Sequence, residues 1–305
     1  MDGTTLDTLR IQLDPASQAG LAVALFTIMF SVALGVRKSD FAAIFEKPKI
    51  YISGVIAQTI GLPLLTLALV FTLSPPPSIA LGMIVVASCP GGNVSNLMAY
   101  AGRADVALSI ALTATSSIIA AFFTPALILL WSSLYPPTAA LLQSIDFNAG
   151  TFLIQTTLLL AVPLTAGMAC AHFASDIATK IRKPAALFGA GLLAVIVVIG
   201  TIDIAPKLLA AFWLIAPPVV IHNACAFFLG ASTGRLTKAP VAARRTLTFE
   251  VGLQNSGLAI VILISQLEGL GGAAAIAAAW GVWHLVAGGA MVALFRRIDA
   301  NRSTP

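Results

Sequence analysis

Long apolar stretches, separated by short polar or proline-containing breaks, dominate the chain. A stretch of about 20 apolar residues is long enough to cross a bilayer as an α-helix. The breaks include a run of three prolines at 75–77, a proline pair at 136–137 and charged runs such as 180–183. The pattern predicts nine membrane-spanning helices, at about residues 18–36, 50–73, 79–101, 106–134, 150–172, 185–202, 208–231, 246–267 and 271–295.

The composition agrees with this pattern. Hydrophobic residues make up 58% of the 305 residues and charged residues only 10%. In soluble domains, apolar residues make up about 45–50% of the chain and charged residues about 25%. The sequence therefore predicts an all-α polytopic membrane protein, and it excludes a disordered chain, a nucleic-acid-binding protein and an ordinary cytosolic enzyme.

The positive charges predict how the chain is oriented. If the N-terminus is outside, nine spans place 15 of the 17 Lys and Arg residues on the inside. Cytoplasmic loops are enriched in these residues, and a span count wrong by one would move every later loop to the other side. We therefore expect a multi-pass protein of the cell (inner) membrane, with residues 1–17 as an extracytoplasmic segment without signal-peptide character and residues 296–305 as a cytoplasmic tail.

Two of the predicted spans contain polar interruptions. The third holds Cys-Pro-Gly-Gly-Asn-Val-Ser-Asn at 89–96, and the eighth holds Glu-Val-Gly-Leu-Gln-Asn-Ser-Gly at 250–257. Irregular backbone is tolerated at membrane depth only where it lines a cavity or meets protein partners. The two spans lie five apart and so run in opposite directions, which is typical of inverted repeats with a binding site between broken helices. The alternative is a pair of ordinary kinked helices.

Glu250 is the one acidic residue that the span pattern places inside the membrane rather than in a loop, a tail or a span end. An intramembrane carboxylate is by default a candidate functional residue. The alternative is a carboxylate at the cytoplasmic end of its span, paired with Arg244 or Arg245.

Three hydroxyl residues, Ser109, Thr113 and Ser116, share one face of the fourth span because they lie four and three residues apart. Such residues also join membrane helices without any ligand. Here the polar break at 95–96 precedes them by one short turn, so we expect both groups to lie together. Hydroxyls, amide oxygens, freed carbonyls and a single carboxylate favour a hard monovalent cation. Sodium is the natural candidate, and a proton on Glu250 is the alternative.

These motifs resemble the bile acid:sodium symporter family. The resemblance runs from about residue 18 to residue 295, and identifies the chain as similar to bacterial homologues of the apical and hepatic bile acid transporters. It implies two bound Na⁺ ions. The first would be held by Ser95, Asn96, Ser109, Thr113 and Glu250. The second would be held by Gln58, Glu250, Gln254 and the backbone carbonyls of Val251 and Leu253.

The resemblance also implies a division of the transporter domain, residues 18–295, into two parts. A core, at about 50–134 and 208–295, would contain two crossing broken helices. A panel, at about 18–36 and 150–202, would move against it. The family often has Asn after Trp-His in the last span, whereas Leu285 follows His284 here.

Four residues are candidate substrate contacts: Asn93, Asn255, His222 and His284. The first two lie in the polar breaks. The histidines lie within spans, where a lone histidine commonly bonds to a neighbouring helix instead.

The function predicted from these features is sodium-coupled symport of an organic anion such as a bile acid or a related carboxylate. The chain has no Gly-x-x-x-x-Gly-Lys-Ser/Thr motif, so no ATPase partner is expected. His-Glu-x-x-His and Gly-x-Ser-x-Gly are also missing from the sequence, so no enzymatic activity is expected. The alternatives are a proton-coupled carboxylate transporter, an ion channel and an intramembrane enzyme.

Overall fold

The computed structural model describes residues 3–37, 41, 45–145 and 147–303. Its N-terminal half contains helices α1 (Gly3–Thr8), α2 (Pro15–Ala33), α4 (Pro48–Ile56), α5 (Leu62–Leu73), α6 (Pro77–Ser88), α7 (Asn93–Ala101), α8 (Val106–Leu134) and α9 (Pro136–Ser144), with a π-helical turn η2 (Ala57–Gly61) between α4 and α5. Its C-terminal half contains α10 (Ala149–Phe173), α11 (Ser175–Thr201), the 3₁₀ turn η3 (Ile202–Ile204), α12 (Ala205–Ala210), α13 (Phe212–Leu236), α14 (Val241–Gly252), α15 (Ser256–Ser265) and α16 (Gly271–Ser303). The described residues form no strand longer than an isolated bridge, so the predicted all-α fold is confirmed.

Seven helical segments within the described residues are long and apolar enough to cross a membrane. They are Pro15–Ala33, Pro48–Leu73, Val106–Leu134, Ala149–Phe173, Ser175–Ala210, Phe212–Leu236 and Gly271–Asn301. The third and eighth predicted spans are each divided into two shorter helices, α6 with α7 and α14 with α15. The protein is therefore a multi-pass membrane protein.

Each interruption has a local cause. Cys89 is extended because the residue before a proline is disfavoured in the helical region, and α6 ends at Ser88. The second interruption follows Gly252, the last residue of α14. Asn255 then starts α15 by accepting a hydrogen bond from the Leu258 amide on its side-chain oxygen, at 3.0 Å.

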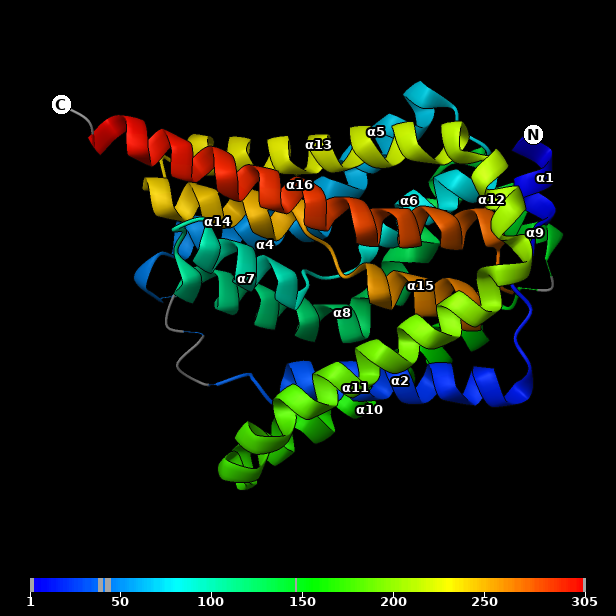
Figure 1. Cartoon of the computed structure of the whole chain (residues 1–305), viewed down its shortest axis with the longest axis horizontal. Coiled ribbons are helices and arrows are strands. Elements are labelled where there is room, and N and C mark those ends of the chain that lie inside the picture. Colours follow the sequence, from blue (N-terminus) through cyan, green and yellow to red (C-terminus); the bar gives the residue numbers. More distant parts are fainter. Residues whose placement is uncertain (1–2, 38–40, 42–44, 146, 304–305) are drawn as a thin grey trace.

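The two interruptions meet in space. The amide of Asn255 donates to the carbonyl of Pro90 at 2.9 Å, and the amide of Gly92 donates to that of Leu253 at 3.4 Å. Gly91 and Gln254 form an antiparallel bridge between them. Figure 1 shows α6–α7 and α14–α15 running in opposite directions through the middle of the molecule. Irregular backbone at this depth is thus satisfied by protein partners.

The helices form two groups. Helices α10 and α11 both pack along α2, and the three lie along one side of the molecule in Figure 1. The crossing half-helices lie in the other group, with α13 against α14 and α16 against α6 and α15. Contacts of α8 with α10 and of α15 with α2 join the groups. The division into a panel and a core, and the movement of one against the other, stay predictions.

Two details differ from the sequence pattern. Helix α11 begins at Ser175, so the charged run at 180–183, predicted as a break between spans, is part of the helix. A helix does not have to end where the bilayer ends, and long basic side chains extend from it toward water. The segment after the fourth span, expected to be a loop, contains the short helix α9, which has Pro136 and Pro137 in its first turn, where proline is tolerated.

Candidate functional site

Glu250 lies at the point where the half-helices cross, and its side chain is buried among hydroxyl groups. It is 1% exposed. Its Oε1 atom accepts hydrogen bonds from Ser95 at 2.6 Å and from Ser109 at 2.5 Å. Its Oε2 atom accepts one from Thr113 at 3.0 Å. The carboxylate of α14 is therefore held by α7 and by α8, the helix that follows α7 after one short turn.

Asn96 completes this oxygen cluster. Its side-chain oxygen lies 2.8 Å from the hydroxyl of Ser109 and 3.4 Å from that of Thr113. Seven oxygen–oxygen contacts of 3.4 Å or less join the five side chains of the cluster. The three hydroxyl groups supply one proton each, so they cannot fill every contact. The remaining lone pairs are ligands suited to a small hard cation.

The arginines considered as partners of Glu250 bond elsewhere. Arg244 donates through Nε to the carbonyl of Ala239 at 2.8 Å. Arg245 forms a bidentate pair with Asp299 of α16, at 2.9 and 2.5 Å. The alternative of a Glu250–arginine pair is therefore wrong, because the arginines of the preceding turn point away from the crossing.

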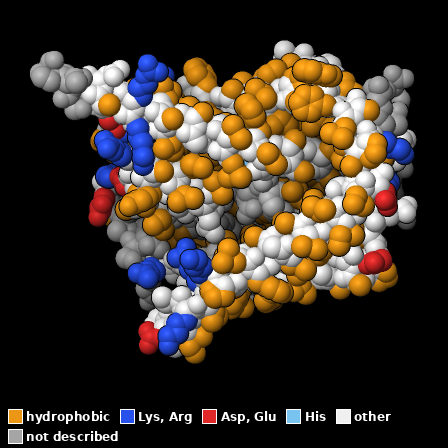
Figure 2. Space-filling model, in the orientation of Figure 1, with side chains coloured by type: hydrophobic (Ala, Val, Ile, Leu, Met, Phe, Trp, Pro, Cys, Tyr) orange, Lys and Arg blue, Asp and Glu red, His pale blue; other side chains and the backbone are white. Residues whose placement is uncertain are grey.

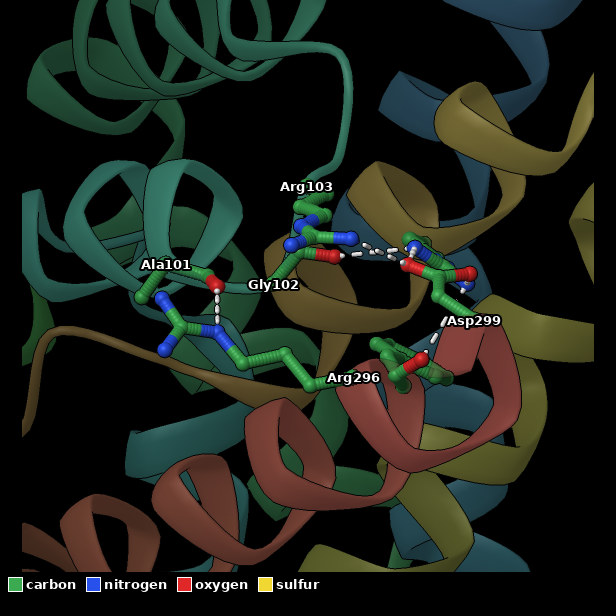
Figure 3. Close-up of polar contacts among 7 residues, drawn as sticks. Ala101, Gly102, Arg103, Arg296 and Asp299 are labelled. Carbon is green, nitrogen blue, oxygen red and sulfur yellow. Dashed lines mark hydrogen bonds and ion pairs between the residues drawn. The ribbon is translucent and has the colours of Figure 1, made fainter. Parts of the chain in front are cut away.

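The Asp299 pair belongs to a network at the end of α7. The Nη1 atom of Arg103 lies 3.7 Å from the Oδ2 atom of Asp299, and Arg296 donates through Nε to the carbonyl of Ala101 at 2.8 Å (Figure 3). Arg245 also donates to the carbonyl of Gly102 at 3.2 Å. These bonds satisfy carbonyls at the C-terminal end of α7, where cations are favourable. They tie α7, α14 and α16 together beside the oxygen cluster.

A second set of polar groups is formed by Gln58 and residues 250–254. The side-chain amide of Gln58 donates to the backbone carbonyl of Glu250 at 2.9 Å, and that of Gln254 donates to the carbonyl of Val251 at 2.9 Å. The carbonyl of Leu253 accepts the long backbone bond from Gly92. Both glutamine side chains are 2% exposed, and the Oε1 atom of Gln254 has no hydrogen-bond partner among the described residues. The structure thus brings Gln58 to residues 250–254, which contain the other four residues predicted for a second cation, and the cation stays a prediction.

A π-helical turn and a glycine shape this second set. Gln58 lies in η2, just before Pro63, and proline cannot supply the backbone N–H that a regular helix needs at that position. π-turns inside helices often occur at functional sites. A Cβ atom built on Gly91 would lie 2.7 Å from Nε2 of Gln58 and 3.1 Å from Oε2 of Glu250. Any side chain at this position would therefore fill the space between the two groups.

A cavity of about 550 Å³ adjoins the crossing. The polar breaks supply residues 91–94 and 254–257 to its lining, and α16 supplies His284. Asn93 and Asn255 line it as well, so three of the four predicted substrate contacts face this cavity. The opposite wall comes from α2 and α11 and is apolar apart from Ser31, with Ile28, Val32, Ala186, Ala190, Leu193, Ala194, Val197 and Val198. Among the described residues, no Asp, Glu, Lys or Arg lines this cavity.

The two histidines differ in their surroundings. His284 bonds through Nδ1 to the carbonyl of Trp280 on its own helix at 2.7 Å, and its ring borders the cavity. His222 is fully buried and does not line the cavity. Its Nε2 lies 2.7 Å from the hydroxyl of Thr66, and its ring centroid lies 4.6 Å from that of Trp280. His222 joins α13 to α5 and α16.

Two polar residues form hydrogen bonds that were not predicted from the sequence. Asn223 is fully buried and donates to the carbonyl of Gly252 at 2.7 Å, where α14 ends. Its position next to His222 in an otherwise apolar span is the sequence feature that could have indicated a structural role for Asn223. Ser116, which shares a helical face with Ser109 and Thr113, donates to the carbonyl of Thr113 at 3.1 Å instead of reaching Glu250.

Broken helices that cross beside a buried cluster of polar side chains and a cavity are typical of secondary transporters. Comparison with known proteins identifies the family. The chain belongs to the Sodium Bile acid symporter family, whose model matches residues 22–207.

Three relatives illustrate the range of similar proteins. The chain is 31% identical to the uncharacterized sodium-dependent transporter YocS of Bacillus subtilis (strain 168), over 88% of this chain and 80% of that protein. It is 29% identical to the ileal sodium/bile acid cotransporter of Homo sapiens, over 80% of this chain and 68% of that protein. It is 28% identical to the probable sodium/metabolite cotransporter BASS1, chloroplastic, of Arabidopsis thaliana, over 90% of this chain and 66% of that protein.

Proposed function

We propose that the protein is a sodium-coupled symporter of an organic anion. The observation that carries this proposal is the buried carboxylate of Glu250, surrounded by hydroxyl and amide oxygens where two half-helices cross, beside a cavity of about 550 Å³. Family membership and the names of the relatives, which include sodium-dependent and sodium/bile acid transporters, support the same function.

One Na⁺ ion is assigned to the hydroxyl cluster. The oxygens of Ser95, Asn96, Ser109, Thr113 and Glu250 form its ligand set. The hydroxyls that donate to the carboxylate can rotate and present lone pairs to the ion, because a hydroxyl is both a donor and an acceptor. The carboxylate supplies the single negative charge.

A second Na⁺ ion is assigned to the set formed by Gln58 and residues 250–254. Its ligands are the side-chain oxygens of Gln58 and Gln254, the carboxylate of Glu250, and the backbone carbonyls of Val251 and Leu253. The Oε1 atom of Gln254, which has no hydrogen-bond partner among the described residues, supports this assignment, because a buried polar atom is costly without a partner. Glu250 would then contribute to both ions and couple their binding.

The organic anion is assigned to the cavity. Helices α7 and α15 begin beside it, and the N-terminal ends of helices favour negative charge. Asn93, Asn255 and His284 supply polar contacts, while α2 and α11 supply an apolar wall. An anion recognised in this way has a small charged group and an apolar body, as bile acids and related carboxylates have.

The position of the cavity suits a transporter in which ion binding is coupled to movement of the substrate. One wall belongs to α2 and α11, the proposed panel, and the other to α7, α15 and α16 of the proposed core. A movement of panel against core would therefore open and close the cavity toward one side of the membrane at a time, while the ion sites remain within the core.

The proposed orientation has the N-terminus outside. Lys and Arg side chains gather at the end of the molecule where α16 ends (Figure 2). Enrichment of these residues is typical of cytoplasmic ends. The ends of α7, α10 and α16, and the beginning of α14, lie at this same end (Figure 1).

A thermal-shift screen of organic anions in NaCl and in KCl of equal ionic strength tests the function. A ligand that binds the folded state stabilises it by RT ln(1 + [L]/Kd). We expect Na⁺ alone to raise the melting temperature and at least one amphipathic anion to raise it further only in NaCl. Stabilisation that depends on pH but not on Na⁺ would support proton coupling instead, and equal curves in both salts would contradict the proposal.

A further inference from the structure

A second and larger cavity lies away from the crossing half-helices, at the end of the molecule that carries most of the positive charge. Its volume is about 800 Å³. Its lining comes from residues 34–37 after α2, from Phe41, from the end of α10 and from the first turns of α11. None of the described residues of the two polar breaks borders it. It is therefore distinct from the transport cavity.

Basic side chains dominate the charge of this cavity. Arg37, Arg182 and Lys183 line it, and His172 stands at its edge. Asp176 is the single carboxylate among the described lining residues. The first turn of α11, which contains Ser175, also borders the cavity, and its N-terminal end adds partial positive charge. The lining thus favours an anion.

The Arg182 side chain reaches across from α11 to the segment after α2. A Cβ atom built on Gly35 would lie 2.3 Å from the Cζ atom of Arg182. The guanidinium group of α11 therefore lies directly against the backbone just after α2. A side chain at position 35 would require the guanidinium group to move.

Exposed apolar side chains lie on α10 and α11 close in sequence to the residues that line this cavity. Phe173 is 84% exposed and Leu187 is 65% exposed. Leu187 lies one helical turn beyond Lys183, so an apolar surface continues from the basic residues along α11. A molecule with an anionic head and apolar chains could bind both surfaces at once. Basic pockets between the ends of membrane helices bind anionic lipid headgroups.

We propose that this cavity binds the headgroup of an anionic phospholipid. Arg37, Arg182 and Lys183 would contact the phosphate, and the acyl chains would lie along the exposed apolar face of α11. In the proposed orientation the lipid belongs to the inner leaflet. Because the cavity joins α2, α10 and α11, the bound lipid would hold the ends of these three helices together at the membrane surface.

The test measures binding of phosphatidylglycerol to the purified full-length chain, from its stabilisation against heat in detergent. The variants are Arg182→Gln and Lys183→Gln. Lys180→Gln is the matched control, since Lys180 is exposed on the same helix but does not line the cavity. A basic residue near a membrane surface contributes about 1 kcal/mol, so each cavity variant should weaken binding about fivefold. The control should change binding by less than twofold.

Equal losses in all three variants would overturn the proposal, since they would show attraction to surface charge in general. Phosphatidylcholine should not stabilise the protein. Equal stabilisation by inorganic phosphate or by a soluble carboxylate would also overturn it, because the site would then bind a free anion.

A further variant, Gly35→Ala, changes no charge. Its added Cβ atom shifts the far end of the flexible Arg182 side chain, so it should weaken lipid binding less than Arg182→Gln does. A loss as large as that of Arg182→Gln would contradict a contact between Arg182 and the phosphate. Stabilisation by Na⁺, measured on the same samples, should remain as in the wild type and shows that each variant is folded.

Discussion

Glu250→Gln is the substitution in the site that we expect to weaken Na⁺ binding most. The change keeps the shape and one carbonyl oxygen but removes the only negative charge in both proposed ligand sets. Because the carboxylate oxygens lie 2.5–3.0 Å from the surrounding hydroxyls, a cation bound among these oxygens would lie within about 4 Å of the carboxylate. At that distance two unit charges attract by about 4 kcal/mol in a protein of effective dielectric constant near 20.

This attraction converts into an expected change in affinity. About 1.4 kcal/mol corresponds to a tenfold change, so the full charge contributes up to about a thousandfold. The Gln dipole retains part of the interaction, and we expect Na⁺ binding to weaken at least a hundredfold. The assay follows the melting temperature of the purified protein as NaCl replaces KCl at constant ionic strength. The wild type should show a saturable rise that the variant lacks.

Asp203→Asn is the control for loss of a carboxylate, because Asp203 is exposed at the opposite end of α11 from the charged run. It should leave the Na⁺ curve unchanged. A Glu250→Gln protein that is folded and has a wild-type Na⁺ curve would refute the assignment of both cation sites.

Three other predictions concern the hydroxyl cluster, the ionic network and the topology. Ser109→Ala should raise the Na⁺ concentration for half-maximal stabilisation about fivefold, since one neutral ligand contributes about 1 kcal/mol. The control Ser132→Ala, which removes a buried hydroxyl elsewhere on α8, should leave this concentration unchanged. Equal effects of the two variants would indicate that these hydroxyls only pack helices. Asp299→Asn should lower the free energy of unfolding by about 2–3 kcal/mol, because it leaves the buried Arg245 guanidinium without its carboxylate. The loss is smaller than for a fully buried pair because the Asp299 side chain is 23% exposed. An unchanged melting temperature would contradict this. In a cysteine-free background, Gln143→Cys should react with an impermeant thiol reagent from outside and Leu236→Cys from inside; reaction of both from one side would contradict the nine-span topology.

Much of the fold could be predicted from the sequence because a bilayer imposes a simple length rule on apolar helices. The breaks at 89–96 and 250–257 could also be located, since proline, glycine and amide residues within apolar runs are unfavourable unless they serve a site. The grouping of Ser109, Thr113 and Glu250 required more than periodicity. It rested on the short turn between the third and fourth spans and on the resemblance to a family.

The rest depended on contacts between distant segments. Arg245 and Asp299 are 54 residues apart, and nothing in the local sequence pairs them. The pairing of Asn223 with the Gly252 carbonyl depends on how α13 packs along α14. The start of α11 at Ser175 was missed because a charged run was interpreted as a break, although basic residues are compatible with a helix that continues into water.

Uptake into proteoliposomes tests the central claim most directly. Purified protein is reconstituted, and accumulation of the anion identified by the stability screen is measured with an inward Na⁺ gradient, with equal Na⁺ on both sides, and with an inward proton gradient alone. Sodium-coupled symport predicts saturable accumulation above the external concentration only with the Na⁺ gradient, and a dependence on Na⁺ concentration steeper than first order, as two ions require. Equal uptake with and without the Na⁺ gradient, or accumulation driven by protons alone, would contradict it.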